Sequence, residues 1–260
     1  MMRQYIKEML KRKDLVKYLV LSGQKANNRD SYLGYLWWLL DPLLNVLIFY
    51  FLRVVILNRG GPDLPVFLAI GLVVWKWMSA TINGSSRSIT RYSSIINQVY
   101  LPKSIFPIAT TLSEMFNFAF GLIVIAIFLI AFGVMPTWLI IFLPMIILVQ
   151  LLFLLAISLF IGYISVFIRD IDNLTKHVVR LFFYASPVIW EGGMISGSKY
   201  EFIVDLNPIA FILDAYRDVL LYHQVPDFSK LGILALGSII AVFFMLLHYS
   251  KNEHKIIKAL

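Results

Sequence analysis

Ionisable side chains inside two of the apolar runs are the groups of this chain that could act on a ligand. Lys76 stands between Trp75 and Trp77, and Glu114 lies three residues before Asn117. A charge within a membrane span is costly and needs a ligand, water or a partner side chain, and a cation beside an indole can also contact the ring face. Two roles remain open for Lys76 and Glu114, namely contact with a polar substrate or its phosphate and pairing between helices.

Two further charges interrupt an earlier apolar run. Asp41 precedes Pro42, which loosens a helix because proline lacks the backbone N–H, and a buried carboxylate there needs a partner or water. Arg53 lies near the far end of the same run. Its guanidinium could contact a pyrophosphate, or it could extend to the outer membrane surface.

Other chemistries lack the residues that they need. The sequence contains no Gly-x-x-x-x-Gly-Lys-Ser/Thr phosphate-binding loop, no nucleophile elbow and no paired catalytic carboxylates. The four histidines do not have metal-ligand spacing, and the absence of cysteine excludes disulfides and thiolate chemistry. We therefore expect no catalytic residue, no metal site and no bound cofactor in this chain.

The composition predicts a membrane protein. Hydrophobic residues make up 60% of the 260 residues and charged residues only 15%, whereas a soluble domain is about half apolar and about one-quarter charged. The net charge of +8 does not indicate nucleic acid, because the cations cluster between apolar runs as membrane topology requires. The first run starts near Leu33, after a long basic amphipathic stretch, so we expect a retained span rather than a cleaved signal peptide.

The apolar runs predict an all-α integral membrane fold with six transmembrane helices, since a span needs about 20 mostly apolar residues. The predicted spans are residues 33–57, 64–83, 105–132, 137–168, 177–190 and 231–249. Residues 207–222 are amphipathic but carry Asp214, Arg217 and Asp218. They predict a re-entrant helical hairpin between the fifth and sixth spans, and the alternative is a seventh span.

The Lys and Arg residues predict the orientation of these spans. They concentrate in the N-terminal tail, in the loops after the second and fourth spans, and in the C-terminal tail, which places both termini in the cytoplasm. Residues 1–32 are predicted to form a cytoplasmic amphipathic region with an interfacial helix; the alternative is a simple orientation signal. Residues 33–250 form the transmembrane domain and residues 251–260 a cytoplasmic tail.

Several short segments, in this order, resemble a known family. Leu33, Gly34, Trp37 and Pro42 match a Leu-Gly-x-x-Trp-x-x-x-x-Pro stretch. Val99-Tyr100-Leu101-Pro102-Lys103, Arg169-Asp170-Ile171-Asp172-Asn173, Ser186-Pro187-Val188-Ile189-Trp190 and Asn207-Pro208 follow at similar spacing. The whole chain resembles the membrane, or permease, subunit of type-2 ABC transporters that export polysaccharide, O-antigen or teichoic acid.

The resemblance implies a homodimer in the bacterial cytoplasmic membrane, bound to two ATP-binding subunits that hold ATP and Mg and hydrolyse the nucleotide. The substrate would be a lipid-linked glycopolymer, and no nucleic acid is expected. The resemblance also implies a coupling helix that contacts the ATPase; the plain alternative is an ordinary basic loop. Its residues are Asn97, Gln98, Val99, Tyr100, Leu101, Pro102, Lys103 and Ser104, with Tyr100 and Leu101 as apolar anchors.

The resemblance further implies a channel along the first and fifth spans, closed on the outside by a re-entrant gate. The predicted entrance and channel residues are Trp37, Trp38, Asp41, Phe49, Tyr50, Arg53, Phe182, Phe183 and Tyr184. The predicted gate residues are Pro187, Trp190, Asn207 and Pro208. Three alternatives remain open: an exporter of small hydrophobic compounds, a membrane-embedded transferase, and a secondary transporter.

Overall fold

The structure is a computed structural model that describes residues 2–28, 32–58, 60–96, 98, 100–168, 170–195 and 197–260, with only the backbone of residues 24–28 and 35. Within these ranges the secondary structure is helical, with no strand. Five helical segments are long and apolar enough to cross a membrane. They are Trp37–Ile56, Leu64–Ser85, Ile105–Ala131, Trp138–Phe167 and Phe228–Ala259.

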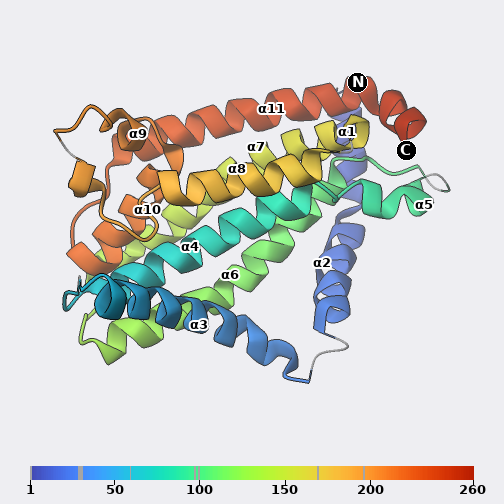
Figure 1. Ribbon diagram of the computed structural model, residues 1–260. Helices are drawn as coiled ribbons and strands as arrows, with labels where there is room; N and C mark the ends of the chain where they lie inside the picture. Colours follow the sequence, from blue (N-terminus) through green and yellow to red (C-terminus); the bar gives the residue numbers. More distant parts are fainter. Residues whose placement is uncertain are drawn as a thin grey trace.

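Helix α4 (Leu64–Ser85) is the centre of the bundle (Figure 1). It packs against α6 (Ile105–Ala131), α7 (Leu143–Phe167) and α3 (Trp37–Phe51), while α11 (Phe228–Ala259) packs along α7. The rings of Trp77 and Phe118 stack with centroids 4.6 Å apart at the α4–α6 contact. Apolar side chains cover α4 on nearly all sides, so most of the large core lies around this one helix.

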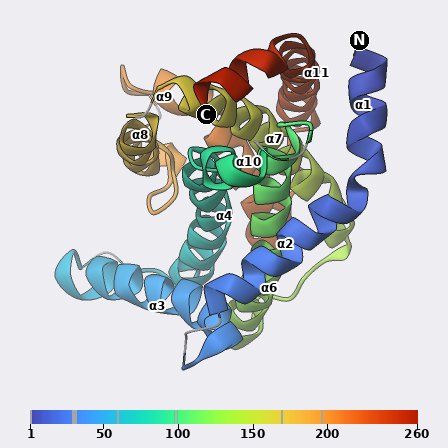
Figure 2. The ribbon, with the colours of Figure 1, turned by 90° about the vertical axis from the view of Figure 1, so that its right-hand side faces the viewer.

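Two helices share one side of α4. Figure 2 shows α3 and α8 (Ile171–Ala185) on the same side of α4, with α6 and α7 on the other side. Helix α3 continues into one π-helical segment, Leu52–Ile56, and its outward residues Leu47, Ile48 and Phe51 are exposed. The bundle therefore has one face on which two helices remain largely uncovered by the rest of the chain.

The two N-terminal helices lie at the end of the bundle where both termini are found (Figure 1). Helix α1 (Met2–Lys11) packs against α11, and α2 (Lys13–Asn28) runs across α6. The hydroxyl of Tyr5 is hydrogen-bonded to the hydroxyl of Ser104 at 2.9 Å. A second, smaller core forms here, which fixes the N-terminal helices to the ends of α6 and α11.

Most predicted spans match helices, but two differ in extent. The prediction of residues 177–190 was wrong at both ends, because α8 begins at Ile171 and ends at Ala185, where Pro187 prevents continuation. Its 15 residues rise only about 22 Å, which is less than the hydrocarbon thickness of a bilayer. Helix α11 extends beyond the predicted 231–249 to Ala259, with a kink at Asn252.

The segment after α8 contains three short elements before α11. These are a 3-10 turn at Gly192–Ile195, helix α9 (Phe202–Asp205) and helix α10 (Pro208–Arg217), which continues as a π-helical segment, Asp218–Tyr222. Asn207 caps α10 by accepting a hydrogen bond from the Ile209 amide at 3.0 Å. Helix α10 packs against α4, α7 and α11, so it is a buried part of the bundle.

Candidate functional site

A buried arginine holds the non-helical chain that follows α8. Arg217, on α10, is 1% exposed. Its Nη1 donates to the Pro187 carbonyl at 2.6 Å and its Nη2 to the Val188 carbonyl at 2.9 Å. The guanidinium also lies over the Phe67 ring, 3.6 Å from its centroid. These contacts satisfy two carbonyls that have left the helix and have no helical donor.

A second arginine and an asparagine complete this arrangement. Arg53, on the π-helical segment after α3, is 8% exposed and donates from Nη1 to the Ile189 carbonyl at 2.8 Å. Asn207 donates from Nδ2 to the Ser186 hydroxyl at 2.8 Å. Two arginines therefore bind three successive carbonyls, and we call Arg53, Arg217 and the loop of residues 186–189 the arginine clamp.

The clamp lies inside the bundle rather than at its rim. Gly71 of α4 approaches the loop so closely that a Cβ there would clash with the Val188 carbonyl and the Arg217 guanidinium. Gly71 is seven residues after Leu64, the first residue of α4, which corresponds to about 10 Å along the helix. The predicted gate residues Pro187 and Asn207 thus meet at this depth, and Trp190 donates from its indole to the Tyr184 carbonyl at 3.1 Å.

The predicted channel aromatics fall into two groups. Phe183 lies 5.7 Å from Phe49 and 5.6 Å from Trp75, measured between ring centroids, so it joins α8 to α3 and α4. Phe182 and Tyr184 are instead exposed, at 39% and 63%. Tyr50, half-buried, packs against the main core, and Pro208 is the first residue of α10.

At the predicted entrance, a cross-helix ion pair joins α3 to α4. The Nζ of Lys76 lies 2.5 Å from Oδ2 of Asp41, and both side chains are about half exposed. Of the two roles open for Lys76, the structure shows pairing between helices. Trp37 is exposed, while Trp38 lies edge-on to the Phe120 ring with centroids 4.7 Å apart.

A small cavity of about 70 Å³ lies next to this ion pair, and Trp38, Pro42, Lys76, Trp77, Glu114 and Asn117 contribute to its lining. Asn117 donates to Glu114 at 3.0 Å. The Trp77 Nε1 and the Asn117 Oδ1 are buried without a hydrogen-bond partner. The cavity has room and hydrogen-bonding partners for ordered water. Asp41 of α3, Lys76 of α4 and Glu114 of α6 therefore lie around one small polar cavity within an apolar region.

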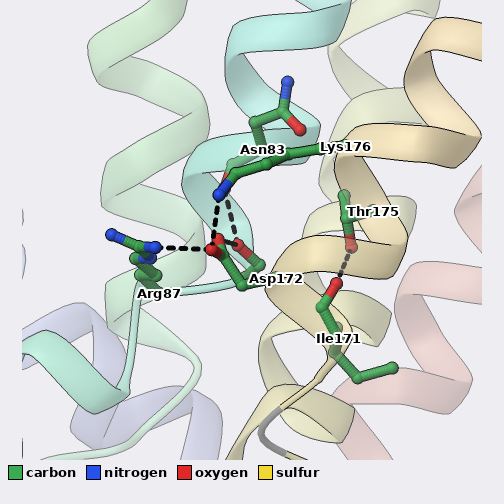
Figure 3. Close-up of polar contacts among 7 residues, drawn as sticks. Asn83, Arg87, Ile171, Asp172, Thr175 and Lys176 are labelled. Carbon is green, nitrogen blue, oxygen red and sulfur yellow. Dashed lines mark hydrogen bonds and ion pairs between the residues drawn. The ribbon is translucent and has the colours of Figure 1, made fainter.

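The start of α8 is bound to the end of α4 through one carboxylate (Figure 3). Asp172 accepts hydrogen bonds from the Ser86 hydroxyl at 2.8 Å, from Arg87 at 2.5 Å and from Lys176 at 2.7 Å. Hydrogen bonds from Arg87 and then Lys176 hold the pKa of this carboxyl well below its usual range. The contact explains why α8 starts six residues before the predicted span.

The predicted coupling segment is bound to the C-terminal part of α11. Tyr100 donates from its hydroxyl to Glu253 Oε2 at 2.7 Å, which raises the pKa of Tyr100 to about 12 because the hydrogen bond favours the neutral phenol. The fully buried Lys103 places its Nζ 3.4 Å from Glu253 Oε1 and 4.9 Å from the Tyr100 ring centroid. Glu253 thus fixes the position of this segment.

Two expectations for this segment need correction. Asn97 and Val99 lie outside the described residues, and residues 98 and 100–104 form turns and irregular chain rather than a helix. The short helices Thr90–Tyr92 and Ser93–Ile96 precede them. Leu101 is 5% exposed inside the chain's own second core, so it is not a surface anchor, whereas Tyr100 is 58% exposed. Gln98 is also exposed, Pro102 is buried, and Ser104 binds Tyr5.

Comparison with known proteins gives consistent matches along nearly the whole chain. Residues 15–221 match the ABC-2 type transporter family. The O-antigen export system permease protein RfbA of Myxococcus xanthus is 28% identical over 243 residues, covering 93% of this chain and 94% of that protein. A protein of the same name from Klebsiella pneumoniae is 27% identical over 246 residues, covering 93% of each.

Substitution of Gly71 tests the close packing of the arginine clamp. Gly71→Ala should lower the melting temperature of the purified protein by several degrees, because the methyl group must displace the loop or Arg217, and such overpacking costs about 1–3 kcal/mol. Gly232→Ala on α11 is the matched control, since nothing lies within 4 Å of its added Cβ. Equal melting temperatures for the two variants would contradict this packing.

Asp172 gives a pH-dependent test of the α4–α8 contact. Asp172→Asn should lower the melting temperature by a few degrees at pH 7, whereas Asp170→Asn should not, because the Asp170 side chain makes no capping hydrogen bond. The pKa of Asp172 is depressed in the folded state, so its stabilisation is present above pH about 4 and is lost as the pH falls toward the folded pKa. A difference between Asp172→Asn and the wild type that grows as the solution becomes more acidic would contradict this assignment.

Proposed function

The chain belongs to the ABC-2 type transporter family, and we propose that it is a permease that moves a lipid-linked polysaccharide, of O-antigen or teichoic acid type, across the bacterial cytoplasmic membrane. The chain is a multi-pass membrane protein of this family. Relatives named as O-antigen export permeases cover almost its full length. The structural observation that carries the proposal is the uncovered side of the bundle, where α3 and α8 present both aromatic and polar side chains.

In this proposal the chain crosses the membrane six times. The short α8 provides the additional crossing, and the loop of residues 186–190 extends it toward the outer surface, with its carbonyls bound by the arginine clamp. An even number of crossings agrees with the position of both termini at one end of the bundle (Figure 1). The excess of Lys and Arg at that end supports a cytoplasmic location.

Two copies of the chain would enclose the path. Helices α3 and α8 are exposed on one side of α4 (Figure 2), and a symmetric dimer that uses this side would bring both helices to the two-fold axis. Phe182 and Tyr184 would then contribute aromatic surface for sugar rings. The clamped loop, with Trp190 and α10, would form the outer gate, and α2 with Trp37 would receive the lipid-linked substrate at the inner surface.

Two ATP-binding subunits would supply the energy, because the sequence has no phosphate-binding loop of its own. They would bind ATP and Mg, and no chemical step would occur in this chain. The short helix Ser93–Ile96 lies at the end where both termini are found (Figure 1). The exposed Tyr100 is bound to Glu253 near the C-terminus, which suits contact with a cytoplasmic partner. Movement of the partner would reach α11 through Glu253 and α6 through Ser104.

Co-expression with an ATP-binding subunit of the same transporter tests the proposal. The purified complex in lipid nanodiscs should have the mass of two permeases and two ATP-binding chains, and it should hydrolyse ATP. Cells that lack the permease should retain the polymer in the cytoplasm. A permease that binds no ATP-binding subunit, or whose loss leaves polymer export unchanged, would refute the assignment.

Tyr100 and Leu101 should give different defects in that complex. Tyr100→Ala removes one hydrogen bond to Glu253 but leaves the Lys103–Glu253 ion pair, so the melting temperature should fall only slightly. The variant should weaken ATPase binding or coupling, because the ring of Tyr100 is exposed. Leu101→Ala should destabilise the permease by about 2–5 kcal/mol, as expected when a buried leucine is removed. Tyr200→Ala, at an exposed tyrosine of the segment between α8 and α9, is the control. Normal ATPase coupling in Tyr100→Ala would exclude this segment as the contact.

A further inference from the structure

The surface of α8 has three faces with different chemistry. Thr175 and Val179 are buried toward the bundle. One exposed face is apolar and contains Leu174, Val178 and Leu181. The remaining exposed face is polar, and its basic residues are Lys176, His177 and Arg180, which fall on one side because residues three and four apart align on a helix. We call these three residues the cationic stripe.

The stripe extends from the inner end of the bundle toward its middle. The Ser86–Asp172 hydrogen bond and the Trp75–Phe183 ring contact show that α8 runs antiparallel along α4, residue for residue. Arg180 follows Asp172 by eight residues, or about 12 Å of helix. With Asp172 at the inner surface of a hydrocarbon layer of about 30 Å, the backbone of Arg180 lies inside the layer, and its side chain extends back toward the inner end.

The positive charge of the stripe is only partly neutralised. Asp172 is shared by Arg87 and Lys176, so one carboxylate faces two cations. Arg180 is exposed and has no ion pair or hydrogen bond within the described part of the chain. An arginine at this depth is costly unless an anion or water accompanies it, and the described part of this chain supplies Arg180 with no anion.

A second copy of the chain does not supply that charge. In the proposed dimer the two-fold axis brings the same surface of each copy together, so the two stripes would line one path and neither would neutralise the other. The neighbouring helix α3 carries one carboxylate, Asp41, which is already paired with Lys76. The outward residues of α3 are otherwise mostly apolar, among them Leu47, Ile48 and Phe51. The exposed cations of this face therefore suit a ligand that carries negative charge.

We propose that the cationic stripe of α8 binds the phosphate or diphosphate group that joins the lipid carrier to the transported glycan. This inference rests on the proposed function and assigns a binding site within its path. A guanidinium forms two parallel charge-assisted hydrogen bonds with a phosphate, and Lys176 at the inner end of the stripe retains donors beside its bond to Asp172. Binding at this site lowers the free energy that is needed to move the charged phosphate through the membrane.

Binding of an isoprenoid diphosphate to the full chain tests the proposal. The permease, alone and with its ATP-binding subunits, is placed in phosphatidylcholine nanodiscs, and its dissociation constants for farnesyl diphosphate and farnesol are measured. Arg180→Gln should weaken farnesyl diphosphate binding about tenfold or more, which corresponds to about 1.4 kcal/mol. Arg180→Lys should restore part of the affinity, and farnesol binding should not change. Lys258→Gln, which removes an exposed cation of α11, should match the wild type.

Several results would overturn the proposal. Unchanged diphosphate affinity in Arg180→Gln would exclude the stripe as a phosphate site, and an equal loss of farnesol affinity would indicate only a structural role for Arg180. A changed number of permease chains in Arg180→Gln would identify the stripe as a contact between copies. If phosphatidylglycerol in the nanodisc abolishes the dependence on Arg180, the stripe binds bulk anionic lipid.

The two proposals can fail separately. If ATP-binding subunits never associate with the permease, the transport assignment fails. The dependence of diphosphate binding on Arg180, measured with the permease alone, still supports or refutes the site on α8.

Discussion

The chain leaves helix α8 at Ser186, about 10 Å along the bundle from the Leu64 end of α4, and residues 186–188 are buried there. Carbonyl groups in such a place cost several kcal/mol each unless they receive hydrogen bonds. Arg217 and Arg53 supply them to Pro187, Val188 and Ile189. Because Arg53 belongs to the segment after α3 and Arg217 to α10, this one requirement fixes the positions of α3, α8 and α10 against α4.

Helix α8 is consequently held at both ends and uncovered in its middle. Asp172 binds its first turn to the end of α4, and the arginine clamp fixes the chain beyond its last turn. The intervening surface is free to combine aromatic and cationic side chains, which a helix enclosed by the bundle could not do. At the end of the bundle where both termini lie, Glu253 and Tyr5 connect α11 and α1 to the segment before α6. The fold thus fixes both ends of α8 and leaves its polar face exposed.

The sequence predicted the long helices well because their apolar runs are as long as the membrane is thick. The limits of α4 and α6 agree with the predicted spans within two residues. Helix α8 was misplaced because Asp172 and Lys176 make its first turns too polar for a hydropathy pattern, and the bonds of Asp172 to Ser86 and Arg87 depend on tertiary structure. The burial of Leu101 and the bonds of Glu253 to Tyr100 and Lys103 also depend on tertiary structure, so the sequence did not predict them. Arg217 was visible as a charge in an amphipathic segment, but its carbonyl partners, about 30 residues earlier, were not.

The central proposal is that α8 and the clamped loop form a full crossing, which would place the segment after α8 outside the cell and both termini inside. The chain has no cysteine, so single-cysteine variants can be labelled in intact cells with a membrane-impermeant maleimide. Gly193→Cys, at an exposed position with nothing near its Cβ, should be labelled without permeabilisation, and Lys258→Cys only after it. Labelling of both positions from the same side would show that α8 does not cross and would contradict this account.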